Sequence, residues 1–308
     1  MTALAESGAL GSLGRARRRM SDGLAGYLFL APWLAGFFLL TLGPTLASLY
    51  LSFTRYDLLN DPVWVGLRNY ERMTIDPRFQ SAVQVTLTYV LWAVPLKLMF
   101  ALALAMILDK GIRGLTVYRA IFFLPSLLGG SVAIAVLWRQ IFGADGMVNK
   151  FLGLFGLGGT SWISDPDTAL GALIVLGVWQ FGSPMIVFLA GLRQIPTDMY
   201  EAAQMDGAGK VRVFFRITLP LLTPVIFFNL VLQTINAFKA FTPAFIVSGG
   251  TGGPIDSTLF YTVYLYQEAF GFFRMGYAAA MAWALLVAIG FFTALQFMSA
   301  KLWVHYEE

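Results

Sequence analysis

Long apolar stretches alternate with short charged stretches along the whole chain. A helix needs about 20 mostly apolar residues to cross the hydrocarbon core of a bilayer. Six stretches reach that length, and they run approximately over 25–53, 82–108, 120–141, 168–192, 218–248 and 275–300. The pattern therefore predicts an all-α membrane protein with six transmembrane helices.

The composition agrees with a membrane setting. Hydrophobic residues make up 58% of the chain and charged residues 12%, which is more apolar and less charged than a typical soluble domain. The chain has no cysteine, so it can form neither a disulfide nor a thiolate metal site. A metal site needs several ligands, so the single histidine, His305, does not predict one, and we expect no metal and no cofactor.

The charges between the apolar stretches set the expected orientation, because Lys and Arg in short loops stay on the cytoplasmic side. With the N-terminus inside, twelve Lys and Arg residues fall in cytoplasmic segments and six fall in outer loops. We therefore expect both termini in the cytoplasm. The net charge of +4 reflects this topology and does not indicate a nucleic-acid partner.

Residues 1–22 differ from the rest of the chain. They are basic and rich in Gly, Ala and Ser, so they have little apolar surface to bury and we expect a disordered cytoplasmic leader that contacts anionic lipid. The uncharged stretch over 24–54 is much longer than the apolar region of a secretory signal, which predicts an uncleaved first span. The transmembrane domain is then expected over 23–308.

A polar segment over 193–217 interrupts the apolar pattern on the expected cytoplasmic side. Asp198 followed by Glu201 has the form of a capping box, and Gly207 and Gly209 can adopt positive φ, so we expect a short helix between Pro196 and Gly207. Residues 210–216 mix Val and Phe with Lys and Arg, which predicts an amphipathic stretch at the membrane surface. A short Ala-rich helix suits docking to another protein, and an ordinary surface connector is the alternative.

This segment resembles the cytoplasmic Glu-Ala-Ala loop of bacterial ABC-importer permeases, in which Ile-x-Leu-Pro follows. The matching residues are Glu201, Ala202, Ala203, Gly207, Ile217, Leu219 and Pro220. The surrounding residues resemble the carbohydrate-uptake branch, which is related to the maltose-transporter permeases. Segments 27–32, 66–70, 252–254 and 257–258 also fit that branch, so the resemblance covers nearly the whole chain.

The resemblance implies a type I ABC importer permease in a bacterial inner membrane, which is not itself an enzyme. It implies that Glu201, Ala202, Ala203, Asp206 and Gly207 couple the chain to an ATPase. The sequence contains no Gly-x-x-x-x-Gly-Lys-Ser/Thr motif, so we expect ATP to bind to partner subunits. The implied partners are two ATP-binding subunits, an extracytoplasmic solute-binding protein and a second permease, with which we expect a heterodimer.

Polar residues inside the spans are candidates for lining a pathway, because they are costly in hydrocarbon. Asn229, Gln233 and Asn236 form one stripe on the fifth span, and their amides could bind sugar hydroxyls or only hydrogen-bond neighbouring helices. Lys239 lies further along, where its long stem lets it reach the outer interface, which we expect. If Lys239 faces the pathway instead, an anionic substrate such as a sugar acid or glycerol phosphate is favoured.

Other pathway candidates are Trp179 and Gln180 in the fourth span and Trp283 in the sixth. Aromatic faces can stack on sugar rings, although packing against lipid or a neighbouring helix is the commoner role of a membrane tryptophan. Lys97 in the second span and Arg139 in the third are charges for which we expect a structural role.

Two other classes of membrane protein are disfavoured by what the spans lack. An ion-coupled secondary transporter normally needs an embedded carboxylate, and none of the six apolar stretches has one in its interior. A membrane-embedded enzyme needs paired reactive groups, and the spans carry none. The expected function is therefore ATP-driven import of a sugar or oligosaccharide, with glycerol phosphate or another polar solute as the alternative.

Overall fold

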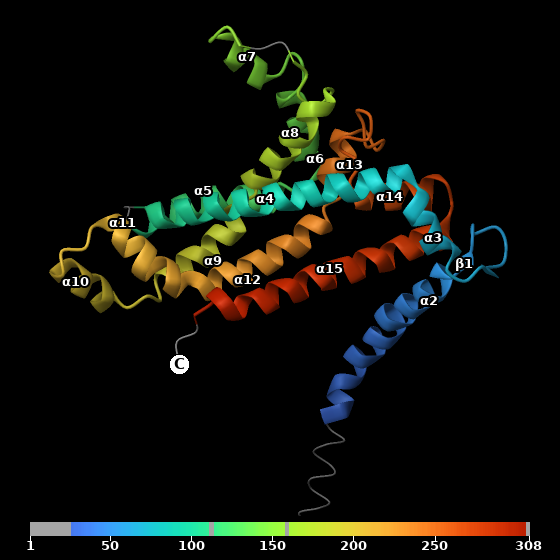
Figure 1. The fold of residues 1–308 in the computed structure, drawn as a ribbon, viewed down its shortest axis with the longest axis horizontal. Helices are drawn as coiled ribbons and strands as arrows, with labels where there is room; N and C mark the ends of the chain where they lie inside the picture. Colours follow the sequence, from blue (N-terminus) through green and yellow to red (C-terminus); the bar gives the residue numbers. More distant parts are fainter. Residues whose placement is uncertain (1–25, 111–113, 158–159, 306–308) are drawn as a thin grey trace, which may run out of the picture.

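The computed structural model describes residues 26–110, 114–157 and 160–305, so the predicted leader over 1–22 lies outside it. Helices dominate these residues (Figure 1), which confirms the all-α prediction. A small antiparallel hairpin pairs β1 (Thr54–Arg55) with β2 (Val63–Trp64).

The helices follow one another along the chain, and π-helical turns are written η. They are η1 (Phe37–Leu42), α2 (Gly43–Ser52), α3 (Arg68–Ile75), α4 (Pro77–Asp109), α5 (Leu115–Leu128), α6 (Val132–Ile141), α7 (Met147–Gly153), α8 (Pro166–Trp179), α9 (Gly182–Leu192), α10 (Thr197–Met205), α11 (Lys210–Val213), η2 (Phe214–Thr218), α12 (Leu219–Phe238), α13 (Thr242–Val247), α14 (Tyr261–Tyr266), η3 (Gln267–Gly271) and α15 (Met275–Trp303).

Within the described residues, four helical stretches are long and apolar enough to cross a membrane without a sharp bend. They are Gly26–Ser52, Pro77–Asp109, Lys210–Val247 and Met275–Trp303. Two bent pairs also qualify, α5 with α6 at 95° and α8 with α9 at 42°. Counting each bent pair as one span gives the six predicted spans, but the third and fourth are broken rather than continuous.

The first of these breaks has a local cause in the sequence. Gly129 and Gly130 end α5, and Ser131 then caps α6 by accepting a hydrogen bond from the Ile134 N–H at 3.3 Å. Such a cap satisfies one of the free N–H groups that every helix start leaves.

Residues at the two breaks also form hydrogen bonds with each other. The Ser126 hydroxyl donates to the Gln180 carbonyl at 3.0 Å and accepts from the Ser183 N–H at 2.8 Å. The Gln180 side-chain amide donates to the Gly129 carbonyl at 3.2 Å. Free backbone groups at membrane depth are tolerated only where protein or a cavity satisfies them, so these contacts explain how two spans can break side by side.

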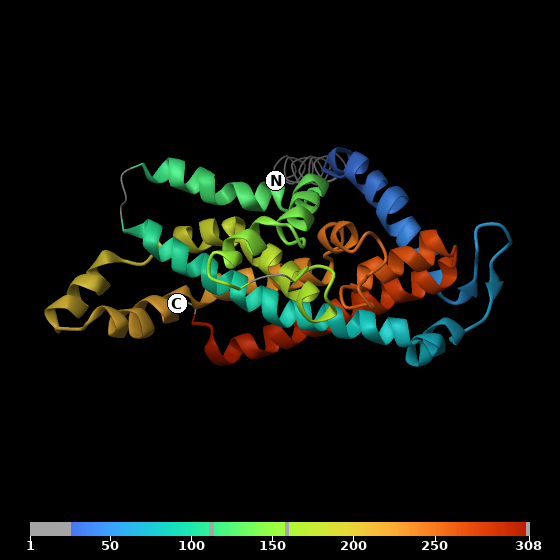
Figure 2. The ribbon, with the colours of Figure 1, turned by 90° about the horizontal axis from the view of Figure 1, so that it is seen from above.

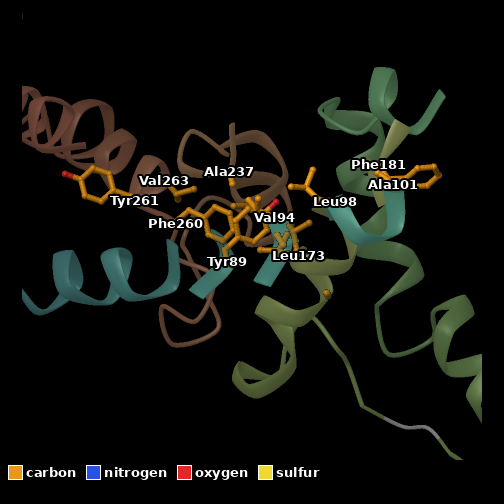
Figure 3. Packing of buried hydrophobic residues seen from close by; sticks show 14 of the residues in the cluster. Tyr89, Val94, Leu98, Ala101, Leu173, Phe181, Ala237, Phe260, Tyr261 and Val263 are labelled. Atoms are coloured by element: carbon orange, nitrogen blue, oxygen red, sulfur yellow. The ribbon is translucent and has the colours of Figure 1, made fainter. Parts of the chain in front are cut away.

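The core is built along α4, which packs against α8, α9, α12 and α14. Alanines on α4 allow this close approach, and Ala82, Ala93, Ala101 and Ala105 are all fully or almost fully buried. Tyr89 packs beside Phe260 with ring centroids 4.7 Å apart, next to Val94 and Leu173 (Figure 3). Pro95 lies within α4, so the Leu91 carbonyl has no N–H partner at that turn.

The two ends of α4 carry different structures. In Figures 1 and 2, α10 and α11 extend beyond one end, and the hairpin and α3 lie at the other. The described C-terminal end lies with α10 and α11 near the start of α12, where the His305 N–H donates to the Thr223 hydroxyl at 3.0 Å. The polar segment and the C-terminal end therefore share one side of the bundle.

Candidate functional site

The predicted helix in the polar segment is α10, and its C-terminal end is well defined. Gly207 adopts a φ of 71°, which glycine reaches without steric cost. The Gly207 N–H donates to the Gln204 carbonyl at 3.0 Å, and the Ala208 N–H donates to the Ala203 carbonyl at 2.9 Å. These two bonds form a Schellman motif, so the prediction that Gly207 ends the helix is confirmed.

The start of α10 differs from the prediction. Pro196 occupies the N-cap with an extended ψ of 133°, and no side chain caps the helix there. Asp198 is therefore already the second helical residue, so it cannot form the capping box with Glu201. Gly209 has a φ of −70°, so the expected positive φ is found at Gly207 alone of the two glycines.

Most of this segment is open to solvent. Glu201, Ala202, Asp206 and Gly207 are exposed, whereas Ala203 is buried at 8% exposure. Large apolar side chains are exposed next to them, namely Met205, Val211 and Phe215. The Tyr200 and Thr218 hydroxyls lie 3.2 Å apart and hold α10 to η2. The segment thus presents an outward surface that is partly apolar and partly charged, with acidic groups at α10 and basic groups over 210–216.

A second candidate site is a cavity of about 260 Å³ beside α4 and α12, which we call the central cavity. Its polar lining residues are Lys97, Gln180, Gln233, Asn236, Lys239 and Thr242. Tyr89, Phe241 and several small apolar residues complete the wall. A mixed lining of amides, ammonium groups and aromatic rings can bind a polar solute from several sides.

Interrupted helices form much of this wall. Gly130 belongs to the break between α5 and α6, and Gln180 to the break between α8 and α9. Lys239 caps the C-terminal end of α12, and the chain runs irregularly from there to α13. Irregular backbone at membrane depth is typical of segments that line a cavity.

The structure brings together four of the six predicted pathway residues. Gln180, Gln233, Asn236 and Lys239 all line the central cavity. Trp179 and Trp283 are not among its lining residues. Trp179 packs beside Trp138, with the ring centroids 5.8 Å apart. Trp283 lines a separate pocket between α15 and the first helix. The side-chain amide of Asn229 donates to the Val225 carbonyl of its own helix at 3.2 Å.

Two lysines contribute to this wall. Lys239 lines the cavity and is exposed. Lys97, for which we expected a structural role, also lines it, and its ammonium donates to the Gln233 side-chain carbonyl at 3.3 Å. The sequence indicates that Lys97 lies deep within its span. It is twelve residues before the end of α4, which corresponds to about 18 Å along the helix.

A polar cluster lies at the other end of α4, and the sequence pattern did not predict it. Glu268 is only 2% exposed, and its carboxylate pairs with Arg274 at 3.2 Å and with Arg72 at 3.6 Å. Arg78 pairs with Asp256 at 2.9 Å. Glu268 fell in an expected outer loop, where nothing in the one-dimensional pattern indicates burial. We call these residues, together with Asp76, the outer polar cluster.

Asp76 joins this cluster to the start of α4. Its carboxylate accepts hydrogen bonds from the Tyr264 hydroxyl at 2.6 Å and the Tyr277 hydroxyl at 3.0 Å, and it caps α4 through the Arg78 and Phe79 N–H groups. Burial alone would raise the pKa of Asp76, but these hydrogen bonds outweigh it and lower the pKa. Burial and the bond to Asp76 raise the pKa of Tyr264.

Within the described parts of the chain, no three His, Cys, Asp or Glu side chains are grouped closely enough to bind a metal ion.

The chain is similar to known transport proteins over almost its full length. The family profile described as "Binding-protein-dependent transport system inner membrane component" matches residues 76–303. A probable ABC transporter permease protein of Bacillus subtilis, YesP, is 52% identical over 295 residues, which cover 95% of this chain and 96% of YesP. The lactose transport system permease protein LacF of Rhizobium radiobacter is 34% identical, over 90% of this chain and 94% of LacF.

A solved structure has the same fold. A chain of a bacterial alginate ABC transporter, crystallised with a periplasmic protein that holds an alginate pentasaccharide, superposes with a TM-score of 0.79. The match covers 92% of this chain and 96% of the other at 20% identity.

Proposed function

This chain belongs to the family of binding-protein-dependent transport system inner membrane components, a family of multi-pass membrane proteins, and from that premise we propose a specific role. It forms half of a pathway for a sugar or oligosaccharide, and it couples that pathway through α10 to ATPase subunits in the cytoplasm.

The observation that carries the coupling role is the exposed surface of α10. Glu201, Ala202 and Asp206 are exposed, small side chains permit close approach, and the Schellman motif fixes where the helix ends. Met205, on α10 itself, is 88% exposed and adds apolar area for a protein contact, a setting in which Met is enriched.

The central cavity supports the pathway role. Gln180, Gln233 and Asn236 offer amide donors and acceptors together, which neutral hydroxyl groups require. The cavity is open on the side of Asn236 and Lys239, which are both exposed. A second permease, which we propose is a different homologous chain, would close that side.

The remaining partners follow from the coupling role. The sequence has no phosphate-binding loop motif, so two partner subunits supply ATP hydrolysis. An extracytoplasmic binding protein delivers the solute, in keeping with the binding-protein-dependent family.

Disulfide cross-linking tests the docking of α10 directly. The chain has no native cysteine, so Ala202→Cys introduces a unique thiol. We expect it to cross-link to a cysteine in the ATPase cleft of the assembled complex. Leu59→Cys, at the outer end and 91% exposed, is the matched control and should give no such product. Equal cross-linking from both positions would contradict the docking.

A bulky substitution tests coupling. In the complex reconstituted with its binding protein, Ala202→Trp should reduce sugar-stimulated ATP hydrolysis and uptake by about tenfold or more, because about 1.4 kcal/mol of lost docking energy gives that factor. Ala202→Ser keeps the side chain small and should behave as the native chain does. Ala202 is preferable to Ala203, whose side chain is buried in the chain itself. An unchanged stimulated rate in Ala202→Trp would overturn the assignment.

A further inference from the structure

The central cavity carries positive charge without a compensating carboxylate. Lys97 and Lys239 both line it, and its described lining contains no Asp or Glu. The ion pairs within residues 26–110, 114–157 and 160–305 involve Arg72, Arg78, Arg193 and Arg274, and neither of the two lysines. Two lysines, and no acidic residue, thus contribute to the described wall of this cavity.

The position of Lys97 makes this arrangement costly unless an anion is present. Lys97 is about 18 Å from the nearer end of α4, by the helical rise, which is too far for its stem to reach bulk water along that helix. Within the described parts of the chain, its ammonium donates to the neutral Gln233 side-chain carbonyl at 3.3 Å. An ammonium group in such surroundings is stabilised by a counter-charge placed in the cavity.

The same wall is suited to a sugar. Amide groups of Gln180, Gln233 and Asn236 can donate to and accept from hydroxyl groups, and Phe241 and Tyr89 offer aromatic surface for the apolar face of a ring. An inorganic anion would use the lysines but not this surface, and a neutral sugar would use the surface but leave both lysines uncompensated.

We infer that the central cavity binds an anionic saccharide, a sugar that carries a carboxylate, with Lys97 and Lys239 as the residues that recognise the charge. This inference rests on the proposed function, because it names the substrate class of that pathway. A carboxylate of the second permease is the alternative source of counter-charge, and the experiment separates the two.

The test uses the complete complex with its binding protein in proteoliposomes. Uptake and ATP hydrolysis are measured with uronate disaccharides and with their methyl esters, which keep the shape and remove the charge. For the native complex we expect the acids to be transported in preference to the esters. For Lys97→Met and Lys239→Met we expect the acid-to-ester ratio of transport rates to fall about tenfold or more, as for the loss of a charged hydrogen bond.

The binding protein is the same in every sample, so a change in the ratio belongs to the permease. Lys301→Met, at the end of α15 and away from the cavity, is the matched control and should leave the ratio unchanged. If the Lys97 and Lys239 variants lose acid and ester transport equally, the lysines pair with the second permease and the inference is overturned. Preferred transport of neutral sugars, unaffected by either variant, overturns the inference and leaves the proposed function standing. If no sugar stimulates the native complex, the proposed function itself fails.

Discussion

The two ends of α4 satisfy their polar groups in opposite ways. At the outer end, Glu268 is buried between Arg72 and Arg274, and Asp76 accepts four hydrogen bonds. At the other end, the acidic groups of α10 are exposed, and a contact between two hydroxyls, Tyr200 and Thr218, holds the helix to η2. The outer end satisfies its acidic groups within the chain, whereas the acidic groups of α10 face outward and are free to contact solvent or a second protein.

The same substitution at the two ends should therefore have very different effects on stability. Glu268→Ala removes the carboxylate between two arginines and should lower the free energy of unfolding by about 2 kcal/mol or more, because it leaves like charges facing each other. Glu201→Ala changes an exposed side chain and should stay within about 0.5 kcal/mol of the native value. Thermal unfolding of the detergent-purified protein measures both.

For transport, Glu201→Ala should have a larger effect than its small effect on stability suggests. Reconstituted complexes with Glu201→Ala should lose coupled uptake, because Glu201 belongs to the proposed docking surface, although the protein is as stable as the native chain. Glu268→Gln keeps the shape of the side chain and should recover part of the lost stability. If Glu201→Ala were as destabilising as Glu268→Ala, the distinction between the two ends would be wrong.

A smaller effect is expected from backbone conformation at the end of α10. Gly207 has a φ of 71°, and no neighbouring atom lies within 4 Å of the position that a Cβ would take there. Gly207→Val therefore introduces strain of roughly 1–2 kcal/mol without a clash. We expect faster hydrogen exchange over 197–213 only.

The matched control for that change is Gly209→Val, since Gly209 has an ordinary φ of −70°. It should leave the exchange rates of α10 as they are. Equal protection loss in both variants would mean that side-chain bulk, rather than the left-handed conformation, determines how α10 ends.

The smallest effect is expected from the acid titration of Asp76. Its pKa is lowered from the ordinary value of 3.8, so its contribution to stability is fully present above that value and is lost as the pH falls through the lowered pKa. The native protein should lose thermal stability in acid more steeply than Asp76→Asn, which has no charge to lose. Parallel acid profiles would show that Asp76 adds nothing to the outer end.

Hydrophobic patterning was sufficient to predict the spans, and Pro196 and Gly207 were sufficient to predict the position of α10. It was not sufficient to predict that the third and fourth spans break, since Gly129 and Gly182 are ordinary residues in an apolar sequence until another helix approaches them. A Cβ on Gly182 would lie 2.5 Å from the Phe122 carbonyl oxygen. That constraint comes from tertiary packing, which one-dimensional periodicity does not contain.

The polar and charged residues show the same limit of prediction from sequence. Gln233, Asn236 and Lys239 were recognised as a polar group on one helix, because residues on the same helix obey a fixed geometry. The contact of Lys97 with Gln233 and the burial of Glu268 were not predicted. The first joins residues 136 positions apart, and the second depends on packing against α15 and the pairing with Arg72 of α3. The spacing of residues along one helix can be predicted from sequence, whereas contacts between helices cannot.

Pro95 determines where α4 can bend most easily. The helix is about 50 Å long, by its 33 residues and the helical rise. Its outer arm is anchored by the outer polar cluster, and its inner arm reaches the side of α10. A helix bends most easily where a backbone hydrogen bond is missing, and Pro95, which removes that bond, is two residues from Lys97. We therefore expect any bending of α4 to concentrate at the turn between Val94 and Lys97, two residues that line the central cavity.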